Sequence, residues 1–240
     1  MKTGLLTKNR KVFIWCVFDW ANSPYPTVIL TFVFSAYFTK LVAEDEISGT
    51  FLWSQTIAFS GLFMAVIAPI LGAISDETGK KKIWILVFSI LAILATMNLW
   101  FVLPDKKSVP LALIAIAISL IAFEFCTIFY NATLIQVANS SSIGKVSGLG
   151  WAAGYIGAII CLLICLFGLV ERNFSFLRLD IDQSEHIRAT TIVVGLWWFI
   201  FSLPFFIFFK EGKEAAHFSS RHILEGFKRL FTTIKNIKHY

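Results

Sequence analysis

The sequence predicts an all-α integral membrane protein with six transmembrane helices. Of its 240 residues, 57% are hydrophobic and only 15% are charged, whereas a soluble domain carries roughly 25% charged residues. The apolar residues gather in six long runs separated by short polar segments. A chain of this length cannot bury so much apolar surface in one core, so most of that surface must face lipid.

Each of the six runs is long enough to cross a bilayer. A helix rises about 1.5 Å per residue, so about 20 apolar residues span a hydrocarbon core of about 30 Å. We predict a bundle over residues 1–210 with spans at 12–39, 51–74, 83–103, 109–138, 147–170 and 189–209. The first run is too long for a signal peptide and lacks a cleavage site, so we expect it to be retained.

The last 30 residues have a different pattern. Apolar residues recur at helical spacing among Lys and Arg residues, at Leu224, Phe227, Leu230, Phe231 and Ile234. This pattern predicts an amphipathic helix on the cytoplasmic membrane surface over residues 211–240. The alternative is a solvated linker.

The basic residues predict that both chain ends are cytoplasmic. Fifteen of the 21 Lys and Arg residues lie in the two ends, in the loop after the second span or in the loop after the fourth. Cytoplasmic loops are enriched in these residues, and an even number of spans also places both ends on one side. Without the tail the bias is only 8 to 6. The abundance of Phe, Ile and Lys fits an AT-rich genome, so we expect a bacterial inner membrane.

The residue types do not indicate an enzyme, a cofactor or a metal site. All four Cys residues fall in apolar runs, where free Cys behaves as a small hydrophobic residue, and their neighbours do not complete a metal site. The four His residues lie in the tail or in an outer loop. The net charge of +6 would suggest nucleic acid in a soluble protein. Membrane topology explains it here, so we expect no nucleic-acid partner.

A carboxylate in the first span makes that span unusual. Asp19 lies about a third of the way into it, where a charged side chain costs roughly 2.5–3.5 kcal/mol. Two prolines follow closely and remove two backbone donors. The segment predicts a broken helix with a polar lining made by Asp19, Asn22, Ser23 and Tyr25. This lining either contacts a solute or ion, or stabilises a kink through internal hydrogen bonds.

The fourth span carries a second, deeper carboxylate. Thr127 and Asn131 share a helix face with Glu124, and Tyr130 lies close by. An apolar environment favours the neutral, protonated carboxyl group. Glu124 is therefore a candidate proton carrier, with a permanently protonated group hydrogen-bonded between helices as the alternative. Embedded carboxylates in the first and fourth spans also suggest a repeat of three plus three helices.

The loop after the second span combines small, acidic and basic residues in a regular spacing. Gly72, Asp76 and Gly79 are followed by Lys80 and Lys81. Small residues let helices approach closely, an acidic residue can cap a neighbouring helix, and lysines anchor a cytoplasmic boundary. An ordinary basic turn is the alternative, and the regular spacing disfavours it.

Three stretches resemble signatures of known transporters. The loop from Gly72 to Lys82 resembles the loop between helices two and three of the major facilitator superfamily, with Lys at the usual Arg positions and Glu77 where a cation is common. Residues 18–25 resemble the first-helix signature of the vacuole effluxer family, which is related to the fungal autophagy permease. Residues 129–132 and 144–157 resemble its fourth-to-fifth helix region.

This resemblance implies the N-terminal half of a major facilitator fold and an alternating-access carrier for a small solute. It implies gating roles for Gly72, Asp76, Gly79, Lys80 and Lys81, and a central cavity lined by the first and fourth helices. Fungal relatives are implicated in amino acid release from the vacuole, so an amino acid is the implied solute, and protons are candidate coupling ions. Small residues spaced for close helix packing occur at Gly148, Gly150, Gly154 and Gly157.

A complete carrier of this superfamily has two six-helix halves with the substrate between them. The chain resembles the first half only. Three expectations follow: a split or truncated gene with the second half on another chain, a homodimer of six-helix bundles, or a fragment of a longer protein. A lone half would expose its polar cavity face to lipid. The alternative function is a non-transporting membrane protein, either a transporter remnant or a scaffold.

Overall fold

The computed structural model describes residues 2–78, 80–171 and 177–211, with side chains described from residue 9 onward and outside 73–78. The tail beyond residue 211, for which an amphipathic helix is predicted, lies outside the described residues. The described chain is helical and holds no strand. As predicted, six stretches are long and apolar enough to cross a membrane: Asn9–Val42, Glu46–Gly72, Lys81–Phe101, Lys106–Val137, Ile143–Val170 and Glu185–Phe208.

The first span is composite, whereas most of the others are built on one long helix each. The first contains α1 (Lys2–Asn22), a π-helical segment η1 (Tyr25–Phe32), α2 (Phe34–Tyr37) and a second π-helical segment η2 (Phe38–Val42). The long helices of the other spans are α3 (Glu46–Thr78), α4 (Lys81–Asn98), α5 (Val109–Asn131), α7 (Ile143–Leu163) with its π-helical end η5 (Ile164–Val170), and α8 (Glu185–Phe208). Short turns at the bundle ends are η3 (Leu99–Phe101), η4 (Lys106–Ser108) and α6 (Leu134–Val137).

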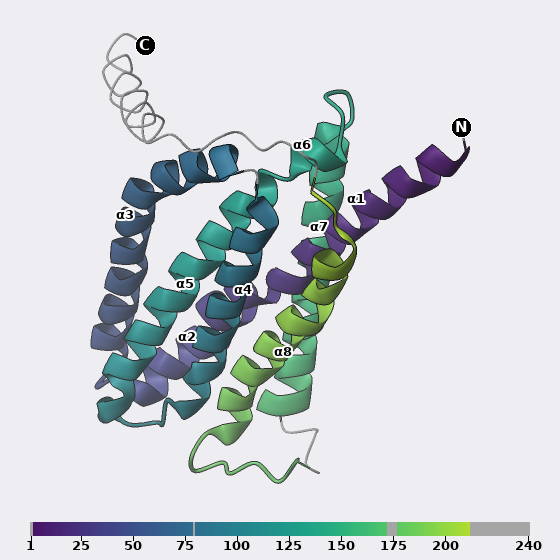
Figure 1. Ribbon diagram of the computed structural model, residues 1–240. Helices are drawn as coiled ribbons and strands as arrows, with labels where there is room; N and C mark the ends of the chain where they lie inside the picture. The colour runs from purple at the N-terminus through teal and green to yellow at the C-terminus, as the bar shows by residue number, and fades with distance from the viewer. Residues whose placement is uncertain (1, 79, 172–176, 212–240) are drawn as a thin grey trace.

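The packing of the helices shows the repeat of three plus three spans. The first span packs through α1 against α7 and α8, and the fourth packs through α5 against α3 and α4. The third and sixth spans, α4 and α8, pack on each other. Each contact made by one of the first three spans thus has a counterpart made by the corresponding span of the last three. Such a repeat is expected for half of a major facilitator fold. Figure 1 shows α3 at the edge of the bundle and α1 crossing its middle.

An aromatic cluster joins α1, α5 and α8 at the centre of the bundle. The ring of Trp15 stacks on that of Tyr130 with centroids 4.5 Å apart, and Phe18 stacks on Tyr130 at 4.9 Å. Phe205 of α8 contacts Phe18 with centroids 4.8 Å apart. All four side chains are buried. The exposed surface is rich in large apolar side chains, as a lipid-facing bundle requires.

Lysines that follow the loop between α3 and α4 bind the ends of other helices. The Lys81 side chain is buried, and its Nζ donates to the Ala132 carbonyl at 3.3 Å, at the end of α5. Lys82 Nζ donates to the Phe209 carbonyl at 2.8 Å, at the end of α8. Lys80 is exposed. Cations at helix C-termini satisfy unpaired carbonyls and the negative end of the helix dipole.

The remaining loop positions are described only in part. Gly72 has open space where a side chain would be added. Asp76 lies in the last turns of α3, but its side chain lies outside the described part of the chain, and so does Gly79 entirely. The geometry therefore adds a helix-capping role for Lys81 and Lys82, which the spacing of the loop did not predict.

We expect Lys82→Met to lower the free energy of unfolding by about 1 kcal/mol, because the last carbonyls of α8 lose a charged donor. The measurement is SDS-induced unfolding in mixed micelles. Lys80→Met is the control, since Lys80 is exposed and adjacent in sequence, and it should unfold like the unmodified chain. Equal stability of the two variants would contradict the capping role.

Candidate functional site

Two prolines interrupt the first span, and Pro24 frees a backbone carbonyl that a side chain of another helix satisfies. Pro24 has no N–H to donate to the carbonyl of Trp20, four residues earlier. That carbonyl instead accepts a hydrogen bond from the indole Nε1 of Trp197 in α8, at 3.2 Å. The preceding carbonyl, that of Asp19, accepts hydrogen bonds from the Ser23 hydroxyl at 2.7 Å and from the Ser23 backbone N–H at 3.2 Å. The predicted break is therefore present, and α8 supports it.

Removing the Trp197 donor should destabilise the bundle by about 1–3 kcal/mol, because the Trp20 carbonyl is left unpaired inside the bundle. We expect Trp197→Phe to cost less when Pro24→Ala is also present, since an alanine N–H can reach the same carbonyl. The measurement is a double-mutant cycle on unfolding free energies. Strict additivity of the two changes would show that the two donors do not substitute for each other.

Glycines of α7 bring that helix into direct contact with the polar part of α1. An added Cβ at Gly157 would lie 2.7 Å from the Trp20 carbonyl oxygen, and one at Gly154 would lie 2.5 Å from Ser23 Oγ. At Gly150 it would lie 2.8 Å from an Asp19 carboxylate oxygen. Gly148, for which packing is also predicted, has no atom within 4 Å of that position and faces open space. The close approach therefore involves three of the four glycines.

A polar pocket of about 380 Å³ lies between η1 and the end of α1, α5 and α7. Six of the residues predicted for a solute or ion pathway line it together: Asp19, Asn22, Ser23, Glu124, Thr127 and Asn131. These side chains come from positions about 100 residues apart in sequence. Glu124 lies close to the middle of the fourth span. The pocket thus joins two embedded carboxylates and two amides at membrane depth.

The electrostatic character of the pocket is acidic. In the described part of the chain, Lys, Arg and His are absent from its lining, and no ion pair engages Asp19 or Glu124. The Thr127 hydroxyl donates to the Phe123 carbonyl at 2.9 Å, so it presents its oxygen lone pairs as acceptors. Acceptor groups in a poorly solvated site favour a cation, a proton or a hydrogen-bond donor over an anion.

The two predicted tyrosines lie behind the pocket wall and not in its lining. Tyr25 is buried, and its hydroxyl shares a 2.8 Å hydrogen bond with Ser119 Oγ of α5. The Tyr130 hydroxyl donates to the Trp15 carbonyl at 2.9 Å. Each hydrogen bond ties the first span to α5. These hydrogen bonds hold the two carboxylate-bearing spans together, and the pathway contact predicted for the two tyrosines stays a prediction.

Other lining residues were not predicted from the sequence. They are Pro26, Thr27, Thr31, Phe32, Phe123, Trp151, Tyr155 and Ala158. Trp151 and Tyr155 form an aromatic wall with ring centroids 5.7 Å apart. Each follows a contact glycine by one position, so both lie on the neighbouring face of α7. That offset from Gly150 and Gly154 is the sequence signal that could have identified them. The rings of this wall are largely exposed.

A bundle of six membrane spans with a polar pocket at mid-depth defines the chain as a polytopic membrane protein, and its helix contacts are those expected for half of a major facilitator fold. The sequence profile of the vacuole effluxer Atg22-like family matches residues 46–240. The chain therefore belongs to this family.

Individual relatives agree with this assignment. The chain is 29% identical over 232 residues to an uncharacterized MFS-type transporter, YxiO, of Bacillus subtilis, covering 94% of this chain and 52% of that protein. An uncharacterized protein of Aquifex aeolicus is 24% identical, over 93% of this chain and 52% of its own length. Autophagy-related protein 22-1 of Aspergillus fumigatus is 33% identical over 76 residues, which are 31% of this chain and 11% of that protein.

The chain spans about half the length of the first two relatives. No solved structure matches it.

Proposed function

We propose that this chain forms one six-helix half of an alternating-access secondary carrier, and that its polar pocket is half of the solute site. The observation that carries the proposal is the convergence of Asp19 and Glu124, from two distant spans, on one pocket at membrane depth. Ionisable side chains inside a membrane are costly and are kept mostly where they bind ions, protons or solutes. Helix packing alone would not require a carboxylate in each of the two spans.

The chemistry of the pocket favours a solute that bears an ammonium group, and an amino acid fits this description. Carboxylates and amide oxygens accept hydrogen bonds from an ammonium group, and the Trp151 and Tyr155 rings offer it cation–π contact. Glu124, deep in its span, is the proposed proton carrier, ionised when the pocket faces one side and protonated when the pocket is closed.

We also propose a bacterial inner membrane location with both chain ends in the cytoplasm. This orientation is supported by the 15 of 21 basic residues that fall, in the sequence, in the two chain ends and in the loops after the second and fourth spans. The second half of the carrier would be another six-helix segment or a second copy of this chain, and it would cover the exposed aromatic wall of the pocket.

The test is a mild-detergent pull-down of the tagged chain from its own membranes, with native mass spectrometry of what is retained. We expect a second six-helix segment or a second copy, and export of a labelled amino acid from vesicles that hold the complex. A chain recovered alone, in vesicles that export none of the twenty amino acids, would contradict the proposal and favour a non-transporting remnant. Cysteine labelling at residues near each chain end reports the orientation.

A further inference from the structure

A second depression lies between α1 and α7 and shares no residue with the polar pocket. This α1–α7 groove has a volume of about 660 Å³ and an almost wholly apolar lining. Its residues are Asn9, Val12, Phe13, Cys16, Val17 and Trp20 of α1, Leu149, Ala152, Ala153 and Ile156 of α7, and Phe201 of α8. It therefore faces the hydrocarbon region of the membrane.

The groove has a polar end and an apolar end. On α7 the lining recurs at three- and four-residue steps from Leu149 to Ile156, and Lys145 lies one helical turn before Leu149 on the same face. On α1 the lining begins at Asn9, next to the exposed Arg10. Arg10 and Lys145 thus flank the end of the groove at which both helices begin.

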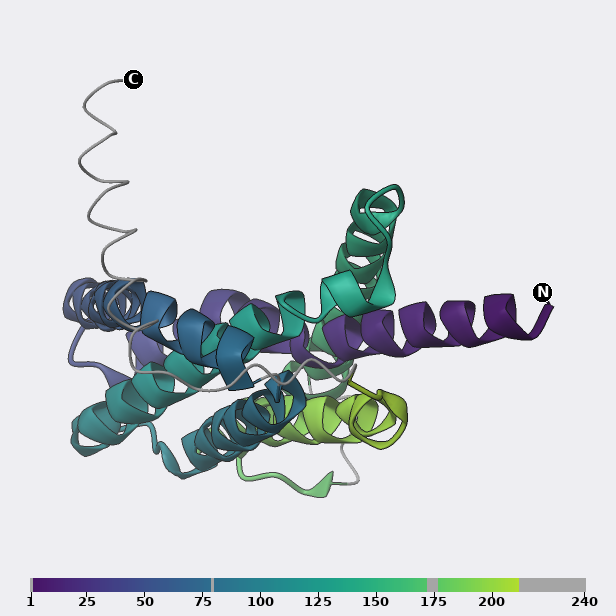
Figure 2. The ribbon, with the colours of Figure 1, turned by 45° about the horizontal axis from the view of Figure 1, so that its top comes forward.

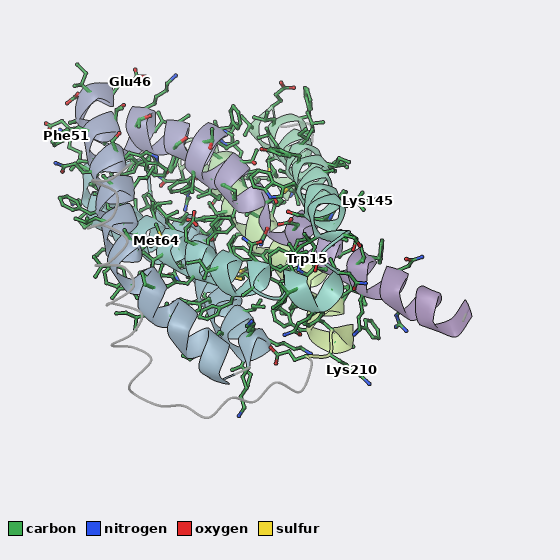
Figure 3. All side chains as sticks on the ribbon, turned by 90° about the horizontal axis from the view of Figure 1, so that it is seen from above. Trp15, Glu46, Phe51, Met64, Lys145 and Lys210 are labelled. Carbon is green, nitrogen blue, oxygen red and sulfur yellow. The ribbon has the colours of Figure 1, made fainter. Side chains whose placement is uncertain are left out.

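The position of Arg10 suits it for binding an anion at this end. Its guanidinium group lies over the Phe208 ring of α8, with 4.9 Å between the guanidinium carbon and the ring centroid. Stacking uses the face of the guanidinium, whereas its N–H donors lie in its plane. Figure 3 shows Lys145 and Lys210 on opposite sides of α1. Figure 2 shows the first turns of α1 projecting beyond the bundle.

We propose that the α1–α7 groove binds an acyl chain of an anionic phospholipid, with its phosphate held by Arg10 and Lys145. A phosphate accepts paired hydrogen bonds from a guanidinium group, and an acyl chain matches the apolar lining. A zwitterionic lipid would bring its own cation close to these residues. An apolar helix in the groove would match its lining but would supply no anion for the two cations at its end.

The test is native mass spectrometry of the purified chain titrated with phosphatidylglycerol or phosphatidylcholine that carry identical acyl chains. We expect phosphatidylglycerol to bind about tenfold more tightly. The double variant R10Q/K145Q should remove this preference by weakening phosphatidylglycerol binding about tenfold, with a much smaller effect on phosphatidylcholine. The control K40Q/K107Q removes two exposed lysines from the opposite end and should change neither affinity.

A groove-filling variant tests the acyl chain separately from the phosphate. Ala152 is exposed within the groove, so Ala152→Trp should occupy it and weaken both lipids by a similar factor, at an unchanged helical circular dichroism spectrum. Equal affinity of the unmodified chain for the two lipids would overturn the proposal. Unchanged phosphatidylglycerol binding by R10Q/K145Q would also overturn it, and so would a dimer in which cross-links from Ala152→Cys show a second copy in the groove.

Discussion

Glu124→Gln and Asp19→Asn should each abolish solute movement by the assembled carrier while the protein still inserts and folds. Each change keeps the shape of the side chain and removes its capacity to ionise. An ionised carboxylate at mid-membrane costs roughly 2.5–3.5 kcal/mol, and a neutral amide is less costly there, so we expect equal or higher thermal stability. Loss of function combined with unchanged or increased stability is typical of a binding group kept at a structural cost.

The measurement pairs counterflow of labelled amino acids in proteoliposomes with thermal unfolding of the same samples. Glu44→Gln is the control, because Glu44 is an exposed acid in the loop between η2 and α3, paired with Lys106 at 2.6 Å, and surface pairs contribute little. Glu44→Gln should transport normally. Normal counterflow by both Glu124→Gln and Asp19→Asn would remove the proposed roles of the two carboxylates.

Gly157→Leu should prevent stable packing of α1 on α7. The added Cβ would meet the Trp20 carbonyl oxygen at 2.7 Å, and a backbone atom cannot move aside as a flexible side chain can. Overpacking of this kind costs about 1–3 kcal/mol, or more when backbone must shift. The packing of α7 on α1 also places Trp151 and Tyr155 at the polar pocket, so we expect a lower yield of folded protein and loss of transport.

Gly148→Leu provides the matched comparison on the same helix. No atom lies within 4 Å of the Cβ position at Gly148, and leucine favours the helix more than glycine does. Size-exclusion chromatography in detergent should therefore show a normal monodisperse peak for Gly148→Leu and an aggregated or reduced peak for Gly157→Leu. Similar behaviour of the two variants would show that the contact with Trp20 is not tight in the membrane.

The sequence predicted the parts of the fold that depend on local composition. Apolar length located all six spans, because crossing lipid requires it. Asp19 and Glu124 were identifiable because a carboxylate in such a run is costly. Their meeting in one pocket was expected from the family resemblance, and it depends on how α1 and α5 pack.

Long-range contacts explain what the sequence did not predict. The positions of Tyr25 and Tyr130 behind the pocket depend on partners 94 and 115 residues away in the chain. The different surroundings of Gly148 and Gly150 depend on which face of α7 meets α1. The spacing of small residues in the sequence does not distinguish Gly148 from Gly150, whereas in the structure only Gly150 of the two lies against α1.

The hydrogen bonds and glycine contacts around the pocket have a mechanical consequence. Tyr25 and Tyr130 tie the first span to α5, Trp197 ties it to α8, and Gly154 and Gly157 lock it against α7. These hydrogen bonds and close contacts join the helices around the pocket to one another. Sliding one of these helices past the others would break several of them at once, so we expect the pocket to keep its shape. In the proposed carrier, a solute would then enter or leave when the whole bundle tilts as a rigid body relative to the second half.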